Sequence, residues 1–220
     1  MNYLATKVGR GFKLIGFILI YQLSALFFNF INTTTPAATT RALLINGTIA
    51  SLFTLGLVIW RYHRQLRQNN PFHFHRHPIT LRSIIELVLL IVIMLIIQSV
   101  WTWTITSHLL SEPDNQKTVE AMLKQSFLLN YIYGGIIAPI FEEYIFRGIF
   151  FNYFFKLTHG RLSRFCGILV CGLVFGFAHT LSFDGNWLFY SALGWVLAFT
   201  YVHFKDIKYS IAIHMFNNLI

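Results

Sequence analysis

The sequence predicts an all-α protein, a polytopic membrane helix bundle of about seven transmembrane helices. Of its 220 residues, 55% are apolar and only 11% are charged. A soluble domain carries about twice that charged fraction, so this chain has too few charges to cover a core of its size with a wetted surface. The apolar residues also fall into runs of about the length that crosses a bilayer, so lipid is the predicted solvent.

Seven runs are candidate transmembrane spans. Each holds about 20 mostly apolar residues, except that the last is short: 12–31, 42–62, 84–103, 126–155, 165–181, 187–204 and 207–220. The first run has the alternative of being a signal peptide, but its length and the lack of a small-x-small cleavage site favour a retained span. No soluble domain is evident, and residues 1–220 are predicted to form a single integral membrane domain.

The basic residues predict the orientation. With the N-terminus in the cytoplasm, 13 of the 17 Lys and Arg residues fall on the cytosolic side. Arg41, Lys117 and Lys124 fall outside, and Arg147 lies within a span. This bias is typical of a multi-pass protein of the cell membrane. The net charge of +9 is therefore attributed to contact with lipid headgroups, and nucleic acid is not an expected partner because no recognition motif is present.

The fourth span carries charges that are costly in hydrocarbon. Each costs on the order of 3 kcal/mol by insertion scales. Glu143 and Arg147 are four residues apart, the spacing of a direct ion pair on a helix. Adjacent carboxylates point about 100° apart on a helix, so Glu142 and Glu143 are not expected to face the same neighbour. A purely structural ion pair explains Glu143 and Arg147 but leaves Glu142 unexplained.

Two further spans contribute polar side chains. The fifth contains His179, and the seventh contains His214 and Asn218 on one face. Counted from the basic residues that end their spans, Glu142 and His179 lie about 20 Å deep at 1.5 Å per residue, so they could meet. His214 lies nearer 10 Å deep by the same count, and the last helix must tilt for it to join them.

This set of residues suits the hydrolysis of an amide. A carboxylate beside a neutral imidazole can hold and deprotonate water. His214 and the Asn218 amide could then stabilise the oxyanion. Alternatively, Glu142, His179 and His214 could hold a divalent metal such as zinc that activates the same water. The sequence does not choose between these two mechanisms.

At these residues the chain resembles the CAAX-processing and bacteriocin-processing intramembrane endopeptidases, also called CPBP or Abi proteins. That family is marked by Glu-Glu-x-x-x-Arg, Phe-x-x-x-His and a third helix with His-x-x-x-Asn or a near variant. Here they appear in this order as Glu142-Glu143-Tyr-Ile-Phe-Arg147, Phe175-Gly-Phe-Ala-His179 and His214-Met-Phe-Asn217-Asn218. The resemblance covers about residues 126–220, where it implies a protease core.

The resemblance implies a role for each matched residue. Glu142 and His179 would activate water, His214 and Asn218 would stabilise the oxyanion, and Glu143 with Arg147 would support them. The implied activity is endopeptidase cleavage of a membrane peptide or protein. It would serve peptide or prenyl-protein processing or bacteriocin self-immunity, and the short length and compact loops favour a bacterial member.

Two alternatives come from other functional classes. A non-catalytic immunity protein would use the same fold to bind and sequester a membrane peptide. A small transporter would use Glu142 and the histidines as a proton relay, but it would be expected to show broken helices or repeated halves, which the sequence lacks. The sequence indicates neither the substrate nor the oligomeric state.

Overall fold

The computed structural model describes residues 3–70, 72–155 and 160–220, with side chains from residue 8 onward. Every regular element in these ranges is helical, which confirms the predicted all-α class. The longer helices are α1 (Tyr3–Asn29), α2 (Ala37–Gln68), α3 (Leu81–Thr106), α4 (Asp114–Gln125), α8 (Arg161–Thr180), α9 (Gly185–Phe204) and α10 (Ile207–Leu219). Lys156, one of the basic residues counted at the predicted cytosolic end, lies outside the described residues.

Five helices in the described part of the chain are long and apolar enough to cross a membrane: α1, α2, α3, α8 and α9. The remaining two predicted spans are helical but differ from a simple span. The last, α10, has 13 residues, which give it a length of about 20 Å. The polytopic helical bundle is confirmed. The helix α4 is not among the predicted elements, because its polar residues place it outside the predicted spans.

The fourth predicted span is a continuous helical rod whose winding changes along its length. It consists of α5 (Phe127–Ile132), the π-helix η1 (Tyr133–Ile137), α6 (Ala138–Glu142), the π-helix η2 (Glu143–Ile149) and α7 (Phe150–Phe154). Pro139 lies in the first turn of α6, and proline cannot donate the backbone hydrogen bond that a regular α-helix requires. Glu142 is the last residue before η2. Such π segments are frequent at functional sites.

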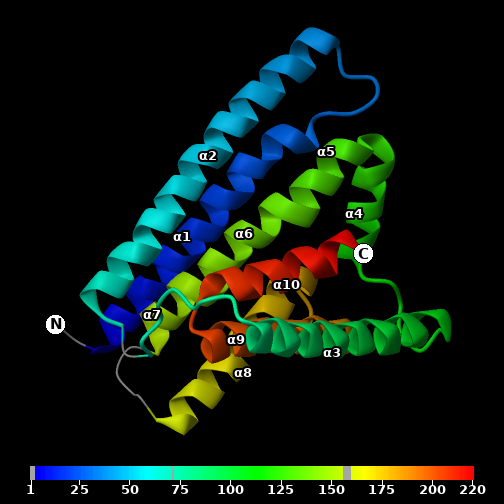
Figure 1. Cartoon of the computed structure of the whole chain (residues 1–220). Helices are drawn as coiled ribbons and strands as arrows, with labels where there is room; N and C mark the ends of the chain where they lie inside the picture. Colours follow the sequence, from blue (N-terminus) through cyan, green and yellow to red (C-terminus); the bar gives the residue numbers. More distant parts are fainter. Residues whose placement is uncertain (1–2, 71, 156–159) are drawn as a thin grey trace.

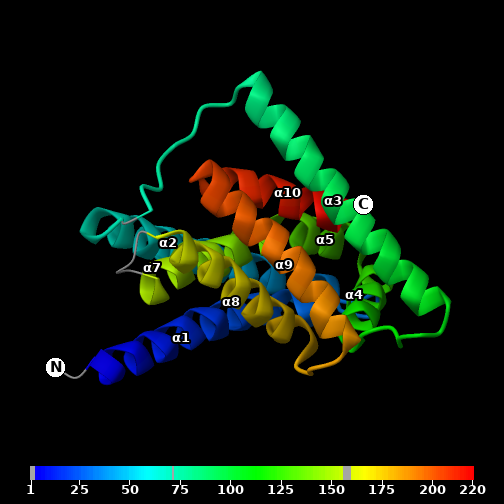
Figure 2. The same ribbon diagram turned by 90° about the horizontal axis from the view of Figure 1, so that it is seen from below.

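The helices form two groups that meet along the fourth rod. Helices α1 and α2 make an antiparallel hairpin, and α3 lies at a steep angle to it, beside α9 and α10 (Figures 1 and 2). Helices α8 and α9 form a second, closely packed hairpin. One buried cluster of apolar side chains draws on both groups, from Leu14 in α1 to Ile213 in α10.

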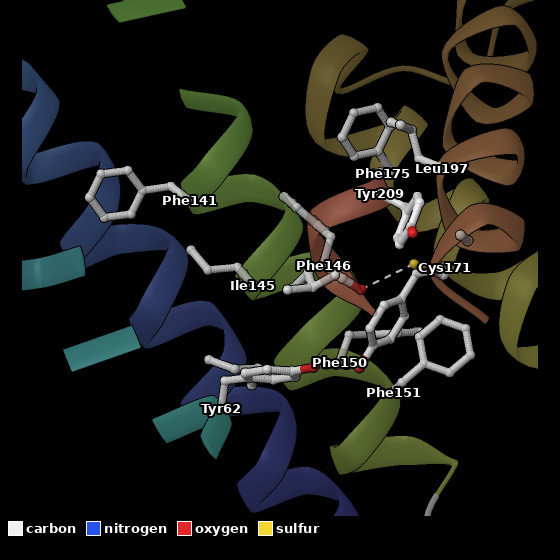
Figure 3. Packing of buried hydrophobic residues seen from close by; sticks show 14 of the residues in the cluster. Tyr62, Phe141, Ile145, Phe146, Phe150, Phe151, Cys171, Phe175, Leu197 and Tyr209 are labelled. Carbon is white, nitrogen blue, oxygen red and sulfur yellow. Dashed lines mark hydrogen bonds between the residues drawn. The ribbon is translucent and has the colours of Figure 1, made fainter. Parts of the chain in front are cut away.

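The centre of this cluster is aromatic. Phe141 points from α6 toward α1 (Figure 3), where its ring stacks on Tyr21 at 4.8 Å. Phe146 contacts the ring of Phe175 edge-on, and its carbonyl accepts a hydrogen bond from the buried thiol of Cys171 (Figure 3). The rod that carries the glutamates is therefore fixed on one side by α1 and on the other by α8.

The basic ends of several helices gather at one end of the molecule. Arg10 near the start of α1 donates a hydrogen bond to the carbonyl of Tyr153 in α7. The loop before α3 is tied to the turn between α9 and α10, where the amide of His75 bonds the carbonyl of Lys205 and the amide of His77 bonds Asp206. This grouping agrees with the predicted cytosolic face, whose orientation in the cell stays a prediction.

Candidate active site

A closed ionic cluster supports the site. One oxygen of Glu143, Oε1, lies 2.9 Å from a guanidinium nitrogen of Arg147 and 2.8 Å from Nδ1 of His214. Glu143 and Arg147 are completely buried. The second terminal nitrogen of Arg147 donates to the carbonyl of Gly194 in α9. The predicted i, i+4 ion pair is confirmed, and the structure extends it to α9 and α10.

Glu142 faces the same histidine from the other side. Its Oε2 lies 3.7 Å from Nε2 of His214 and 3.6 Å from Nε2 of His179. The expectation that the adjacent carboxylates face different neighbours is therefore wrong for His214. An imidazole has two nitrogens on different edges of the ring, so one ring can be bracketed by two carboxylates. The predicted meeting of Glu142 and His179 is confirmed, and His214 joins them from α10.

The ring nitrogens of both histidines have defined roles. Nδ1 of His179 lies 2.8 Å from the carbonyl of Phe175, which can only accept a hydrogen bond, so Nδ1 carries the proton. Nδ1 of His214 likewise donates to the Glu143 carboxylate. Both rings therefore present Nε2 to Glu142. Such outer hydrogen bonds fix the orientation and tautomer of a functional histidine.

The Phe175 ring packs against Arg147 and both histidines. The Arg147 guanidinium lies 4.2 Å from its centre. The rings of His179 and His214 lie 4.2 and 5.7 Å away. Both Phe175 and Arg147 are buried, so the ring covers part of the guanidinium. The Phe-x-x-x-His pattern thus supplies a ring that packs against the cluster together with the carbonyl that orients His179.

The two glutamates differ in how much of their side chain is exposed. The side chain of Glu142 keeps 15% of its surface exposed and that of His179 keeps 19%, whereas Glu143 keeps none. The side chains of Glu142 and His179 are therefore partly exposed, although Oε2 of Glu142 is itself buried and has no hydrogen-bond partner among the described residues. Glu143 is fully enclosed by its structural contacts. The two carboxylates are neighbours in sequence but have separate environments.

The hydrogen bonds of the Asn218 side chain within the described residues do not involve the glutamates or the histidines of the cluster. Its amide nitrogen donates to the carbonyl of Gly134, and its oxygen accepts from the amide of Asn217. Gly134 lies two helical turns before Glu142 on the same rod. The Asn218 side chain therefore ties α10 to the fourth rod, and its role toward an oxyanion stays a prediction.

Two tyrosines join the site from outside the recognised motifs. The hydroxyl of Tyr21 in α1 donates to Oε1 of Glu142 at 3.4 Å, and the Tyr190 ring stacks on His179 at 5.1 Å. Sequence reasoning missed both. The available signal was a hydroxyl-bearing side chain in the middle of an apolar span, but tyrosine is common enough there that this signal is weak.

The candidate metal ligands were Glu142, His179 and His214. Within the described ranges, no group of three or more His, Cys, Asp and Glu side chains has the arrangement of a metal site. The zinc alternative therefore stays a prediction, which metal analysis of the purified protein can test.

Comparison with known proteins identifies the C-terminal half of the chain. Residues 124–220 match the family described as Rce1-like, type II CAAX prenyl endopeptidase. A Bacillus subtilis protein named "Putative membrane peptidase YdiL" is 31% identical over 107 residues, which are 49% of this chain and 41% of the relative. The match thus spans less than half the length of that relative, and no solved structure matches. Residues 124–220, which contain the two glutamates and both histidines, are therefore similar to the Rce1-like family, and the rest of the chain lies outside that match.

Proposed function

We propose that this protein is an intramembrane endopeptidase in which Glu142 and His179 activate a water molecule. One observation carries the proposal: Oε2 of Glu142 lies 3.6 and 3.7 Å from the Nε2 atoms of two histidines whose other ring nitrogens are already engaged. These distances are too long for direct hydrogen bonds. They are short enough for Glu142 and one of these histidines to bind the same water molecule.

The charges of the cluster leave room for one mobile proton. With both glutamates ionised, two negative charges oppose the single positive charge of Arg147. A second proton on the His214 ring, in addition to the one on Nδ1, makes the cluster neutral. A neutral cluster costs less to bury than a charged one. In that state His214 donates from Nδ1 to Glu143 and presents Nε2–H as a second donor.

The reaction follows from these positions. Glu142 takes one proton from water, while Nε2 of His179 accepts a hydrogen bond from the second O–H, which stays on the attacking oxygen. The water oxygen attacks the substrate carbonyl carbon, and the resulting oxyanion accepts a hydrogen bond from Nε2–H of His214. The proton on Glu142 then passes to the amide nitrogen as the C–N bond breaks, giving an acid and an amine. Arg147 and Glu143 act as positioning residues that hold His214.

We propose a membrane-attached peptide or protein as the substrate class. The site lies among helices that cross the bilayer, so the scissile bond must be brought to the membrane. The matched family is described by its action on CAAX prenyl substrates, and this makes a farnesylated CAAX peptide the first probe. Processing of a bacteriocin-like peptide, including self-immunity, is the second substrate assignment within the same chemistry.

The test is cleavage of a fluorogenic farnesylated CAAX peptide by the purified full-length chain. Glu142→Gln keeps the shape of the side chain but removes the base, so we expect kcat to fall by about 10²–10⁴-fold. Glu120→Gln, a change of the same kind on the exposed face of α4, should leave the rate unchanged. Metal content measured on the same preparation tests the zinc alternative.

The outcomes separate hydrolysis from sequestration. If Glu142→Gln and His179→Ala retain wild-type cleavage at equal abundance, the proposal is wrong. In a bacteriocin-protection assay, an enzyme should lose protection in these variants. A protein that only binds the peptide should keep it. The unfarnesylated peptide, run in parallel, shows whether the lipid is part of the recognised substrate.

A further inference from the structure

We propose that a groove between α1, α2 and α7 binds an anionic phospholipid. The groove has a volume of about 520 Å³ and is lined by cationic and apolar side chains. It lies where the start of α1, the end of α2 and α7 come together (Figure 1). None of its lining residues belongs to the glutamate and histidine cluster, and the proposal does not depend on the proposed peptidase activity.

The cationic part of the groove consists of Lys13, Arg61 and Arg64. None of them forms an ion pair with a carboxylate among the described residues. The sequence explains this, because the first acidic residue of the whole chain is Glu86. Helices α1 and α2 therefore supply positive charge without any acid to neutralise it, and the complementary ligand is an anion.

Aromatic rings contact the two arginines of the groove. The Arg61 side chain donates to the hydroxyl of Tyr153 at 3.2 Å and lies 5.3 Å from the centre of its ring. Arg64 lies 5.1 Å from the ring of Trp60. Such contacts orient a guanidinium without cancelling its charge. The donors are therefore arranged before a ligand arrives, which lowers the entropy lost on binding.

The apolar part of the groove decides between a lipid and a soluble anion. Phe17, Ile20 and Leu57 line the side toward the middle of the spans, whereas the cations lie toward the helix ends. Trp60 marks the boundary, as tryptophan commonly does at the headgroup level. A phosphate headgroup fits the cations while its acyl chain fits the apolar side. Basic pockets between transmembrane helices are known to bind anionic headgroups in this way.

Gly16 offers a test of the apolar part without any change of charge. It lines the groove, and a Cβ added there would meet no atom within 4 Å. Gly16→Leu should therefore be tolerated by the fold while its side chain fills the groove. Gly56→Leu is the matched control, because Gly56 also has no neighbour within 4 Å and does not line the groove.

The experiment measures binding of fluorescent phosphatidylglycerol and phosphatidylcholine to the full chain in mixed micelles. We expect wild type to prefer phosphatidylglycerol. Lys13→Gln/Arg64→Gln should weaken that binding about 25-fold, since each cation near a headgroup contributes about fivefold. The control pair Arg67→Gln/Arg164→Gln removes the same charge from exposed positions outside the groove and should change binding less than twofold.

Gly16→Leu should lower phosphatidylglycerol binding at least fivefold with Gly56→Leu unchanged. Equal binding of the two lipids by wild type, or equal loss in the groove and control pairs, would overturn the proposal. Displacement of the lipid by millimolar inorganic phosphate would also overturn it, because the groove would then be a site for a free anion.

Discussion

At the scale of single residues, the site depends on one imidazole bracketed by two carboxylates. His214 bonds Glu143 at 2.8 Å and faces Glu142 at 3.7 Å. Its ring thus connects the buried ion pair of Glu143 and Arg147 to the partly exposed Glu142. A helix would normally direct adjacent side chains to different partners, and the two separate nitrogens of histidine remove that restriction. Any change at His214 is therefore expected to act on both glutamates together.

Tyr21→Phe tests whether α1 contributes to the reaction. Its hydroxyl is a donor to Oε1 of Glu142 at 3.4 Å, and a hydrogen bond of that length to a charged group is expected to contribute about 1 kcal/mol. Removing it should lower kcat/KM about fivefold and leave folding intact, because the Tyr21 ring still stacks on Phe141. The farnesylated CAAX peptide assay measures this effect.

Tyr131→Phe is the matched control for that change. The Tyr131 hydroxyl donates to the carbonyl of Leu219 and makes no contact with Glu142 among the described residues. A similar loss of activity in both variants would show that Tyr21 has no specific role at Glu142. Loss only in Tyr21→Phe would place α1 in the working site.

At the scale of elements, the α8–α9 hairpin sets the position of His179. A Cβ on Gly172 would lie 2.0 Å from the Trp195 ring and 2.8 Å from the carbonyl of Ser191, and one on Gly176 would lie 2.7 Å from the carbonyl of Trp187. These glycines, four residues apart, let the helix backbones approach closely, as small residues do in membrane helices. His179 lies one turn beyond Gly176.

Gly172→Ala should therefore destabilise the protein by about 1–3 kcal/mol, the usual cost of overpacking. Its unfolding temperature in detergent should fall, and cleavage should fall with it as His179 shifts away from Glu142. Gly56→Ala is the control, since its Cβ would meet no atom within 4 Å and alanine favours the helix by about 1 kcal/mol. Equal melting temperatures for wild type and Gly172→Ala would contradict the close-packing explanation.

At the scale of the whole molecule, the arrangement of helix ends predicts an orientation. The basic end of α2 at Arg67 should face the cytoplasm, and α4 with Lys117 should face the outside. Single cysteines at these exposed positions, in a chain with Cys166 and Cys171 replaced by alanine, can be labelled in intact cells. A membrane-impermeant maleimide should label Lys117→Cys and not Arg67→Cys. The reverse pattern would invert the assigned topology.

The family match and the contacts around the site draw on different halves of the molecule. The family match is confined to residues 124–220, yet Tyr21 reaches Glu142 from α1. The proposed lipid groove is also built mainly by α1 and α2. The N-terminal hairpin therefore contacts the Glu142 site through Tyr21 and supplies most of the residues that line the groove.

The sequence by itself determined that the helices are surrounded by lipid, that the protein is all-helical, and which polar residues lie within the spans. Few charges, long apolar runs and three costly polar patches are local properties, so composition and spacing were enough to detect them. Spacing likewise predicted the ion pair of Glu143 with Arg147. Only the tertiary structure decided that His214 lies between two carboxylates, that Asn218 bonds Gly134, and that Tyr21 joins Glu142. These contacts depend on how separate helices cross and on the π turn after Glu142, and helix periodicity along one segment carries no information about either.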